Sequence, residues 1–219
     1  MPLKLYMHPL SSFCQKVLVA LYENATPFEP ELVDLGNEIS RADFLKVWPV
    51  GQFPVLRDGD RVIPESSIII EYLAQHYPGK IPLIPDDADR ARETRQEDRF
   101  YDLRVQVPMQ KIVGDRMRPD GQKDPFGVQQ ARAQLQTAYS LIDRTMSTRL
   151  WATGDQFTMA DCAAAPALFY ANWALPLSGN LRHARAYHDR LMLKPSYVRA
   201  IEEARPYFAL FPQAAAETA

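Results

Sequence analysis

Two short stretches of the sequence place chemically useful side chains at expected helix starts. Ser11, Ser12 and Cys14 stand where one amphipathic segment begins, and Glu65 and Ser66 stand directly before another. The first N–H groups of a helix have no acceptor within it, and the helix dipole favours an anion there by about 0.3–1 kcal/mol. The start at Glu65 combines a carboxylate, a hydroxyl and free N–H groups, and it therefore predicts an anion-binding site.

A β-hairpin leads into this second stretch. Pro54 stands at the mouth of a short apolar strand, and proline belongs at a strand start or edge because it has no N–H to donate. Asp58 and Gly59 are a strong turn signal, which predicts paired strands at 55–57 and 61–63. The predicted hairpin ends directly before the helix start.

The order of elements in the first half predicts a mixed sheet. Periodicity and turn residues indicate, in order, a strand, helix, strand, helix, strand, strand and helix at 3–7, 13–22, 28–34, 40–47, 55–57, 61–63 and 68–77. Ser12 with Gln15 fits a capping box for the first helix, and Ser66 and Ser67 stand where the last helix needs its N-cap. A right-handed crossover followed by a hairpin predicts four strands in one sheet.

The second half carries no strand signal. A Pro-rich stretch at 79–88 predicts a linker, so we expect one domain over 1–78 and an all-helical domain over 89–219. Long helices are expected at 89–117, with a kink at Pro108, and at 128–150. Thr158 and Asp161 form a capping-box pattern before a small, apolar helix that should be buried at the centre.

Composition excludes several classes of protein. Hydrophobic residues make up 47% of the 219 residues, charged residues 24%, and the net charge is −2, as in an ordinary globular protein. No basic run predicts nucleic-acid binding, and no apolar segment approaches the ~18 residues of a membrane span. Cys14 and Cys162 lie in separate halves and the first residues lack a signal-peptide core, so we expect a reducing cytoplasm.

These motifs together resemble the cytosolic glutathione transferase family. The resemblance rests on Gly-Gln-Phe-Pro-Val-Leu at 51–56, Pro-Glu-Ser-Ser at 64–67 and Ser-Ser-Phe-Cys at 11–14. Phe-Thr-Met-Ala-Asp at 157–161 also matches the capping motif of the family's helical domain. The resemblance implies a thioredoxin-like first domain, an all-helical second domain, and a serine-type, bacterial-like member.

The resemblance implies that Ser11 activates the thiol of glutathione. A free thiol titrates near ~8.5, and a hydrogen bond to the charged sulfur with the helix dipole would lower that pKa by about one to three units. Ser12 is the neighbouring cap or substitute, and Cys14 is a candidate for a mixed disulfide with glutathione. The alternatives are that both serines only cap a helix and that Cys14 only packs; Tyr6, at the family's other catalytic position, is expected to be core.

The remaining glutathione contacts are also implied by the resemblance. A cis Pro54 would free the Phe53 backbone to pair with the cysteinyl unit, and Glu65 and Ser66 would bind the ammonium and carboxylate of the γ-glutamyl unit. Gln52 would contact the cysteinyl-glycine end. Lys46 would approach the glycine carboxylate, unless it is simply an exposed helix lysine.

The second substrate should bind between the domains. We expect Met7, Leu10 and Phe13 to line that pocket, facing candidates from the first two helices of the second half. Those candidates are Arg99, Tyr101, Arg104, Met109 and Arg116. Asp98 is a further candidate for the glutathione ammonium, although solvated charge is the ordinary interpretation on so polar a helix. No metal is expected, because His183 and His188 do not share one helix face.

The resemblance thus implies a homodimeric cytoplasmic glutathione transferase for detoxification. Its partners would be glutathione, as co-substrate, and a small hydrophobic electrophile, with neither nucleic acid nor membrane. Two alternatives remain: a glutathione-dependent isomerase or thiol reductase of the same fold, and a non-enzymatic glutathione-binding or scaffold protein.

Overall fold

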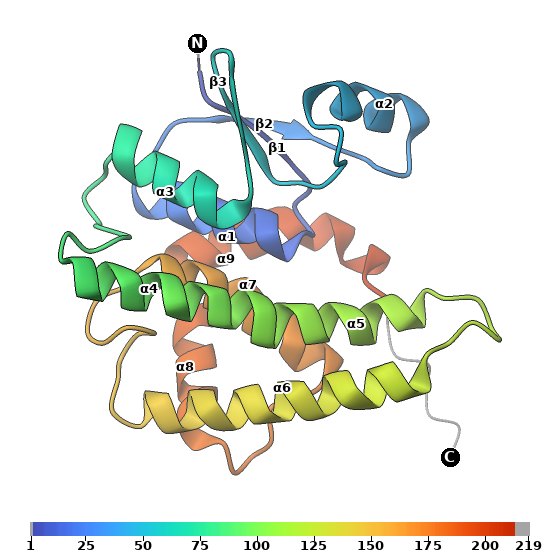
Figure 1. Cartoon of the computed structure of the whole chain (residues 1–219), viewed down its shortest axis with the longest axis vertical. Helices are drawn as coiled ribbons and strands as arrows, with labels where there is room; N and C mark the ends of the chain where they lie inside the picture. The colour runs from blue at the N-terminus through green and yellow to red at the C-terminus, as the bar shows by residue number, and fades with distance from the viewer. Residues whose placement is uncertain (1, 213–219) are drawn as a thin grey trace.

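The structure, a computed structural model, describes residues 2–212. The last seven positions of the expected second domain, 213–219, lie outside the described residues. The chain forms a small sheet with three helices, followed by an array of helices (Figure 1). Helices α1 and α3 lie between the strands and the helical part, so one face of the sheet is covered where the two parts meet.

The four strands form the predicted mixed sheet. They are β1 (Lys4–Met7), β2 (Glu29–Leu32), β3 (Val55–Asp58) and β4 (Arg61–Pro64), in the order β2-β1-β3-β4. The strand β1 runs parallel to β2 and antiparallel to β3, which pairs with β4 through the predicted hairpin. This arrangement confirms the thioredoxin-like sheet and brings the end of β1 and the start of β3 to one edge.

Three helices belong to the sheet, and two of them have a different N-cap from the one predicted. The helices are α1 (Ser12–Glu23), α2 (Glu38–Val47) and α3 (Ser66–His76). Ser11, not Ser12, is the N-cap of α1, because the Ser12 side chain is buried and its hydroxyl accepts a hydrogen bond from Gln106 Nε2. Glu65, not a serine, is the N-cap of α3, since the chain must turn into the helix directly after β4 ends.

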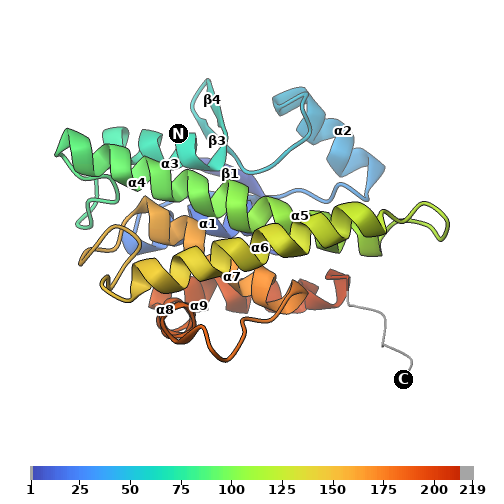
Figure 2. The ribbon, with the colours of Figure 1, turned by 60° about the horizontal axis from the view of Figure 1, so that its bottom comes forward.

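The helical part starts with a long rod that changes its winding midway. The rod consists of α4 (Ala88–Phe100), a π-helical segment (Tyr101–Gln106) and α5 (Val107–Arg116), so the interruption predicted at Pro108 lies just before that proline. It lies beside α6 (Pro125–Met146), as Figure 2 shows. The remaining elements are α7 (Met159–Ala174), α8 (Arg182–Met192), α9 (Pro195–Ala204) and a 3₁₀ segment (Arg205–Leu210).

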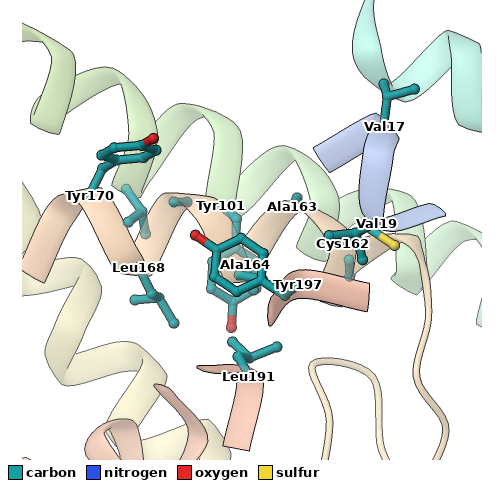
Figure 3. Close-up of a cluster of buried hydrophobic side chains, with 14 of the residues drawn as sticks. Val17, Val19, Tyr101, Cys162, Ala163, Ala164, Leu168, Tyr170, Leu191 and Tyr197 are labelled. Carbon is teal, nitrogen blue, oxygen red and sulfur yellow. The ribbon is translucent and has the colours of Figure 1, made fainter. Parts of the chain in front are cut away.

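Helix α7 is the centre of the molecule, as predicted. Figure 3 shows its small side chains among buried residues that α1, α8, α9 and the π-helical segment contribute. The Thr158–Asp161 capping box is present, and buried Asp161 also accepts hydrogen bonds from Ala152 N at 2.8 Å and Tyr187 Oη at 2.6 Å. A run of alanines lets α1 approach α7 closely, so the helix that carries Ser11 is seated on the helical part.

Candidate active site

A cleft of about 710 Å³ opens where the sheet part meets the rod. The edge of the sheet and the start of α3 form one wall, and the α4–α5 rod forms the other. The first wall includes Ser11, Phe13, Gln52, Phe53, Pro54, Glu65, Ser66 and Ser67, and the second includes Asp98, Arg99, Asp102, Leu103, Val107 and Gln110. The cleft therefore brings most of the predicted glutathione residues together.

Ser11 lines this cleft from the turn between β1 and α1. Its backbone N–H donates to His8 O at 2.9 Å, and its Oγ accepts from Cys14 N at 3.4 Å. Because that hydroxyl is used as an acceptor, its proton is still available for a ligand. The start of α1 adds the positive end of its dipole, so the position suits a thiolate.

The structure separates Ser11 from the other two candidates nearby. Ser12 points away from the cleft and bonds Gln106 on the rod. Cys14 is fully buried in the core, and burial raises the pKa of its thiol to about 12. A buried, protonated thiol is a poor nucleophile, so Cys14 does not meet the requirements of a mixed-disulfide site.

The peptide bond between Phe53 and Pro54 is cis, as the resemblance implied. Gln52, Phe53 and Pro54 all line the cleft directly before β3. Lys46 does not: its side chain is 77% exposed, and its Nζ lies 2.7 Å from Asp43 Oδ1. The structure therefore supports the exposed-helix interpretation of Lys46.

Glu65 and Ser66 face the cleft from the first turn of α3. Glu65 has φ 71° and ψ 119°, a conformation that a residue with a side chain rarely adopts. Its side chain makes no capping bond to the helix, so its carboxylate is left to the cleft. Ser66 is buried at the helix start, where its N–H and hydroxyl are suited to a ligand carboxylate.

A buried ionic cluster that the sequence analysis missed joins the two walls of the cleft. Lys16 Nζ lies 2.7 Å from Asp98 Oδ1 and 2.8 Å from Asp102 Oδ2, and the side chains of Lys16 and Asp98 are each 1% exposed. Lys16 also donates to Ser67 Oγ at 2.8 Å, and that hydroxyl donates to Asp98 Oδ2 at 2.6 Å. The interpretation of Asp98 as a solvated surface charge is therefore wrong.

The cluster joins three elements, with two carboxylates for one ammonium. Burial raises the pKa of Asp102, while the neighbouring Lys16 lowers it. The signal that could have revealed the cluster is Lys16 itself, a lysine within the apolar run of α1, which needs a buried counter-ion. The spacing of Asp98 and Asp102 places both carboxylates on one face of the rod.

The wall for a second substrate differs from the prediction. Phe13 lines the cleft, but Met7 belongs to the sheet core and Leu10 is not among the lining residues. Of the five candidates on the rod only Arg99 lines the cleft, since Tyr101 and Met109 are buried. Arg104 and Arg116 are absent from the lining. Arg116 donates instead to the carbonyls of Pro212 and Ala174.

The rod candidates rested on no motif, and the π-helical segment adds a change of register that sequence periodicity does not reveal. Sequence periodicity assumes 3.6 residues per turn, whereas a π-helical turn holds more residues and rotates the side chains that come after it. From this segment onward, Leu103, Val107 and Gln110 face the cleft, together with Leu35 and Trp48 from the sheet part. Leu35, Trp48, Leu103 and Val107 thus form an apolar patch in a cleft whose rod side is otherwise polar, beside the Gln110 amide.

Two further features of residues 2–212 bear on the chemistry. None of the helices described is both long and apolar enough to cross a membrane. Within that same range, no group of three or more His, Cys, Asp and Glu side chains could hold a metal ion.

Comparison with known proteins identifies the family. The model of the glutathione S-transferase N-terminal domain matches residues 5–81, and that of the C-terminal domain matches residues 125–191. Glutathione S-transferase 3 of Zea mays is 30% identical over 211 residues, which cover 91% of this chain and 93% of the maize protein. The stringent starvation protein A homolog of Histophilus somni is 25% identical over 212 residues, covering 92% and 91%.

A solved structure agrees with these matches. The glutathione S-transferase of Rhodospirillum rubrum superposes with a TM-score of 0.78 at 26% identity, covering 90% of this chain and 91% of that one. The chain therefore belongs to the glutathione S-transferase family. Glutathione is the substrate that gives this family its name.

Proposed function

We propose that this protein is a glutathione transferase and that Ser11 activates the thiol of the bound tripeptide. The observation that carries the proposal is the position of the Ser11 hydroxyl. It caps α1 with its oxygen, leaves its proton free, and faces a cleft shared with Pro54 and Glu65. A hydrogen bond to the thiolate and the α1 dipole together supply the lowered thiol pKa that conjugation at neutral pH requires.

The rest of the tripeptide is assigned to the first wall of the cleft. Glu65 binds the ammonium of the γ-glutamyl unit, and Ser66 binds its carboxylate through the hydroxyl and the N–H of the α3 start. The backbone of Phe53 pairs with the cysteinyl unit, and Gln52 contacts the cysteinyl-glycine end. Every one of these residues lines the cleft.

The thiolate then attacks an electrophilic carbon held against the apolar patch of the cleft. The thiol proton passes to solvent, the sulfur electron pair forms the C–S bond, and a leaving group departs with its bonding pair; where there is none, the displaced π pair takes a proton from solvent. Trp48, Leu103 and Val107 of this patch, with Phe13 from the first wall, orient a small hydrophobic electrophile. The protein contributes orientation and charge stabilisation without a covalent intermediate of its own.

The setting of this chemistry is also part of the proposal. The homodimer, the cytoplasmic location and a role in detoxification follow from the resemblance to the family. We assign residues 1–78 to the glutathione-binding domain, 79–88 to the linker and 89–219 to the helical domain. Sedimentation velocity tests the homodimer directly.

The function is tested by measuring glutathione affinity and conjugation to an activated aryl halide. We expect saturable binding and turnover, with binding retained but turnover strongly reduced in Ser11→Ala. Binding without turnover, combined with reduction of a glutathione mixed disulfide, would support the reductase alternative. Binding without either activity would support the scaffold alternative, and absence of binding would refute the proposal.

A further inference from the structure

One fully buried polar side chain holds the turn before Ser11. Gln15 is 0% exposed, and its Nε2 donates to Pro9 O at 2.8 Å and to Tyr170 Oη at 2.9 Å. Its Oε1 accepts from Tyr197 Oη at 3.3 Å. The carboxamide therefore uses both of its donors and its acceptor within the core, as buried amides must to avoid a large desolvation cost.

The orientation of this amide is fixed by its partners. Pro9 O can only accept, so the nitrogen of Gln15 must face it and the oxygen must face the opposite side, where Tyr197 donates. The two tyrosines come from α7 and α9 of the helical part, and Figure 3 shows both within the buried cluster. Tyr170 and Tyr197 of the helical part thus fix the Gln15 amide, and this amide bonds Pro9 O in the turn before Ser11.

Gln15 contacts the turn before Ser11 with its side chain and Ser11 itself with its backbone. Its side chain binds the carbonyl two residues before Ser11, and its backbone N–H donates to Ser11 O at 2.9 Å. The interactions of His8 O with Ser11 N and of His8 Nδ1 with Leu10 N complete the turn, at 2.9 and 3.2 Å. Of these contacts, the hydrogen bond to Pro9 O is the one that the Gln15 side chain makes, and it ties the turn that carries Ser11 to the buried core.

We propose that Gln15, held by Tyr170 and Tyr197, is a positioning residue that aims the Ser11 hydroxyl at the sulfur of glutathione. The inference rests on the proposed function of Ser11. It goes beyond that function by making the aim of the hydroxyl depend on α7 and α9, which contribute little else to the cleft. Misplacing a reacting group by about 1 Å can cost on the order of 100-fold in rate, so a small movement of this turn is sufficient.

The test compares the bound thiol of glutathione in wild type and in Gln15→Met. Methionine keeps the length of the side chain but removes its hydrogen bonds. We expect the thiol pKa to rise by at least about half a unit and kcat to fall roughly tenfold, while KM for glutathione changes less than about twofold. In a Ser11→Ala background the same substitution should change neither the thiol pKa nor kcat further, because Gln15 acts through Ser11.

A matched control is Tyr22→Phe on the same helix. Tyr22 Oη donates to Glu203 Oε2 at 2.6 Å, so it also ties α1 to α9, but at the opposite end of α1 from the turn. We expect this variant to lower the melting temperature without moving the thiol pKa. If Gln15→Met does not fold, the Tyr170→Phe/Tyr197→Phe double variant frees the amide with smaller changes in volume and should raise the thiol pKa.

The outcomes separate the inference from the function on which it rests. A wild-type thiol with an ordinary pKa would refute the proposed function. A lowered wild-type pKa that Ser11→Ala restores, but that Gln15→Met or the tyrosine double variant leaves unchanged, would overturn only the positioning role.

Discussion

Ser11, Ser12 and Cys14 lie within four positions, yet the structure gives each a different environment. Ser11 faces the cleft, Ser12 bonds the rod, and Cys14 is buried in the core. The sequence predicted that this stretch matters, but it left all three as candidates. Which residue faces the cleft depends on how α1 rotates against α7, and that rotation is set by tertiary packing that no local pattern contains.

The buried state of Cys14 predicts that it does not react in the native protein. Its thiol is fully buried with a pKa of about 12, and burial also raises the pKa of Cys162 well above its ordinary value. At pH 8 an aromatic disulfide reagent should therefore label neither cysteine until the protein unfolds. The thiol assay is followed with and without denaturant, and stoichiometric labelling of Cys14 in the folded enzyme would restore the mixed-disulfide alternative.

At the scale of elements, the sheet and its hairpin were predictable because proline, Asp-Gly and apolar alternation act locally. The mixed four-stranded sheet, the capping box at Thr158 and the buried α7 are confirmed. The exact helix starts and the register of the rod were not predictable. The N-cap at Glu65 follows from the end of β4, and the π-helical segment changes which side chains of the rod reach the cleft.

The start of α3 predicts a conflict between stability and binding at Glu65. Its φ of 71° costs about 1–3 kcal/mol in a residue with a side chain. Glu65→Gly removes that strain but adds roughly 0.5–1 kcal/mol of backbone entropy to the unfolded chain. We expect a net gain of about 1 kcal/mol in the free energy of unfolding, measured by urea denaturation.

The same substitution should weaken glutathione binding. Loss of one charge-assisted hydrogen bond, worth about 1.5–3 kcal/mol, corresponds to roughly 10- to 100-fold in Kd. Glu65→Gln is the control, because it retains the backbone strain while removing the charge; it should lose affinity without gaining stability. Unchanged calorimetric affinity in both variants would contradict the role proposed for this carboxylate.

At the scale of the whole molecule, the two parts are joined through buried polar groups as well as through apolar packing. The Lys16–Asp98–Asp102 cluster joins α1 to the rod, with Ser67 of α3 between them. Sequence reasoning could infer a two-part molecule from the linker and the loss of strand signals. It could not pair Lys16 with carboxylates so distant in the sequence, because only the packed interface brings them together.

This cluster predicts a large loss of stability in Lys16→Met. Removing the ammonium leaves two buried carboxylates without a cation, which typically costs about 3–5 kcal/mol. Arg92→Met is the matched control on the rod, since Arg92 pairs with Asp89 at 2.6 Å on the exposed surface and should cost less than about 1 kcal/mol. Equal free energies of unfolding for the two variants would show that the cluster contributes little.

The loss should also depend on pH. The pKa of Asp102 is raised in the folded state, so its contribution to stability is present at low pH and is lost as pH rises through the folded pKa. Lys16 lowers the pKa of Asp102. Removing Lys16 therefore raises that pKa and extends to higher pH the range in which protonated Asp102 stabilises the fold. The difference in unfolding free energy between Lys16→Met and wild type should therefore shrink on acidification below neutral pH; a constant difference would contradict this.

The central claim is that Ser11 stabilises the thiolate of bound glutathione, and titration of that thiol tests it most directly. Ultraviolet absorbance of the thiolate is followed against pH in wild type and in Ser11→Ala, each saturated with glutathione. We expect a wild-type pKa about one to three units below the ~8.5 of a free thiol, returning towards that value in the variant with little change in affinity. A lowered pKa that persists without the Ser11 hydroxyl would contradict the account.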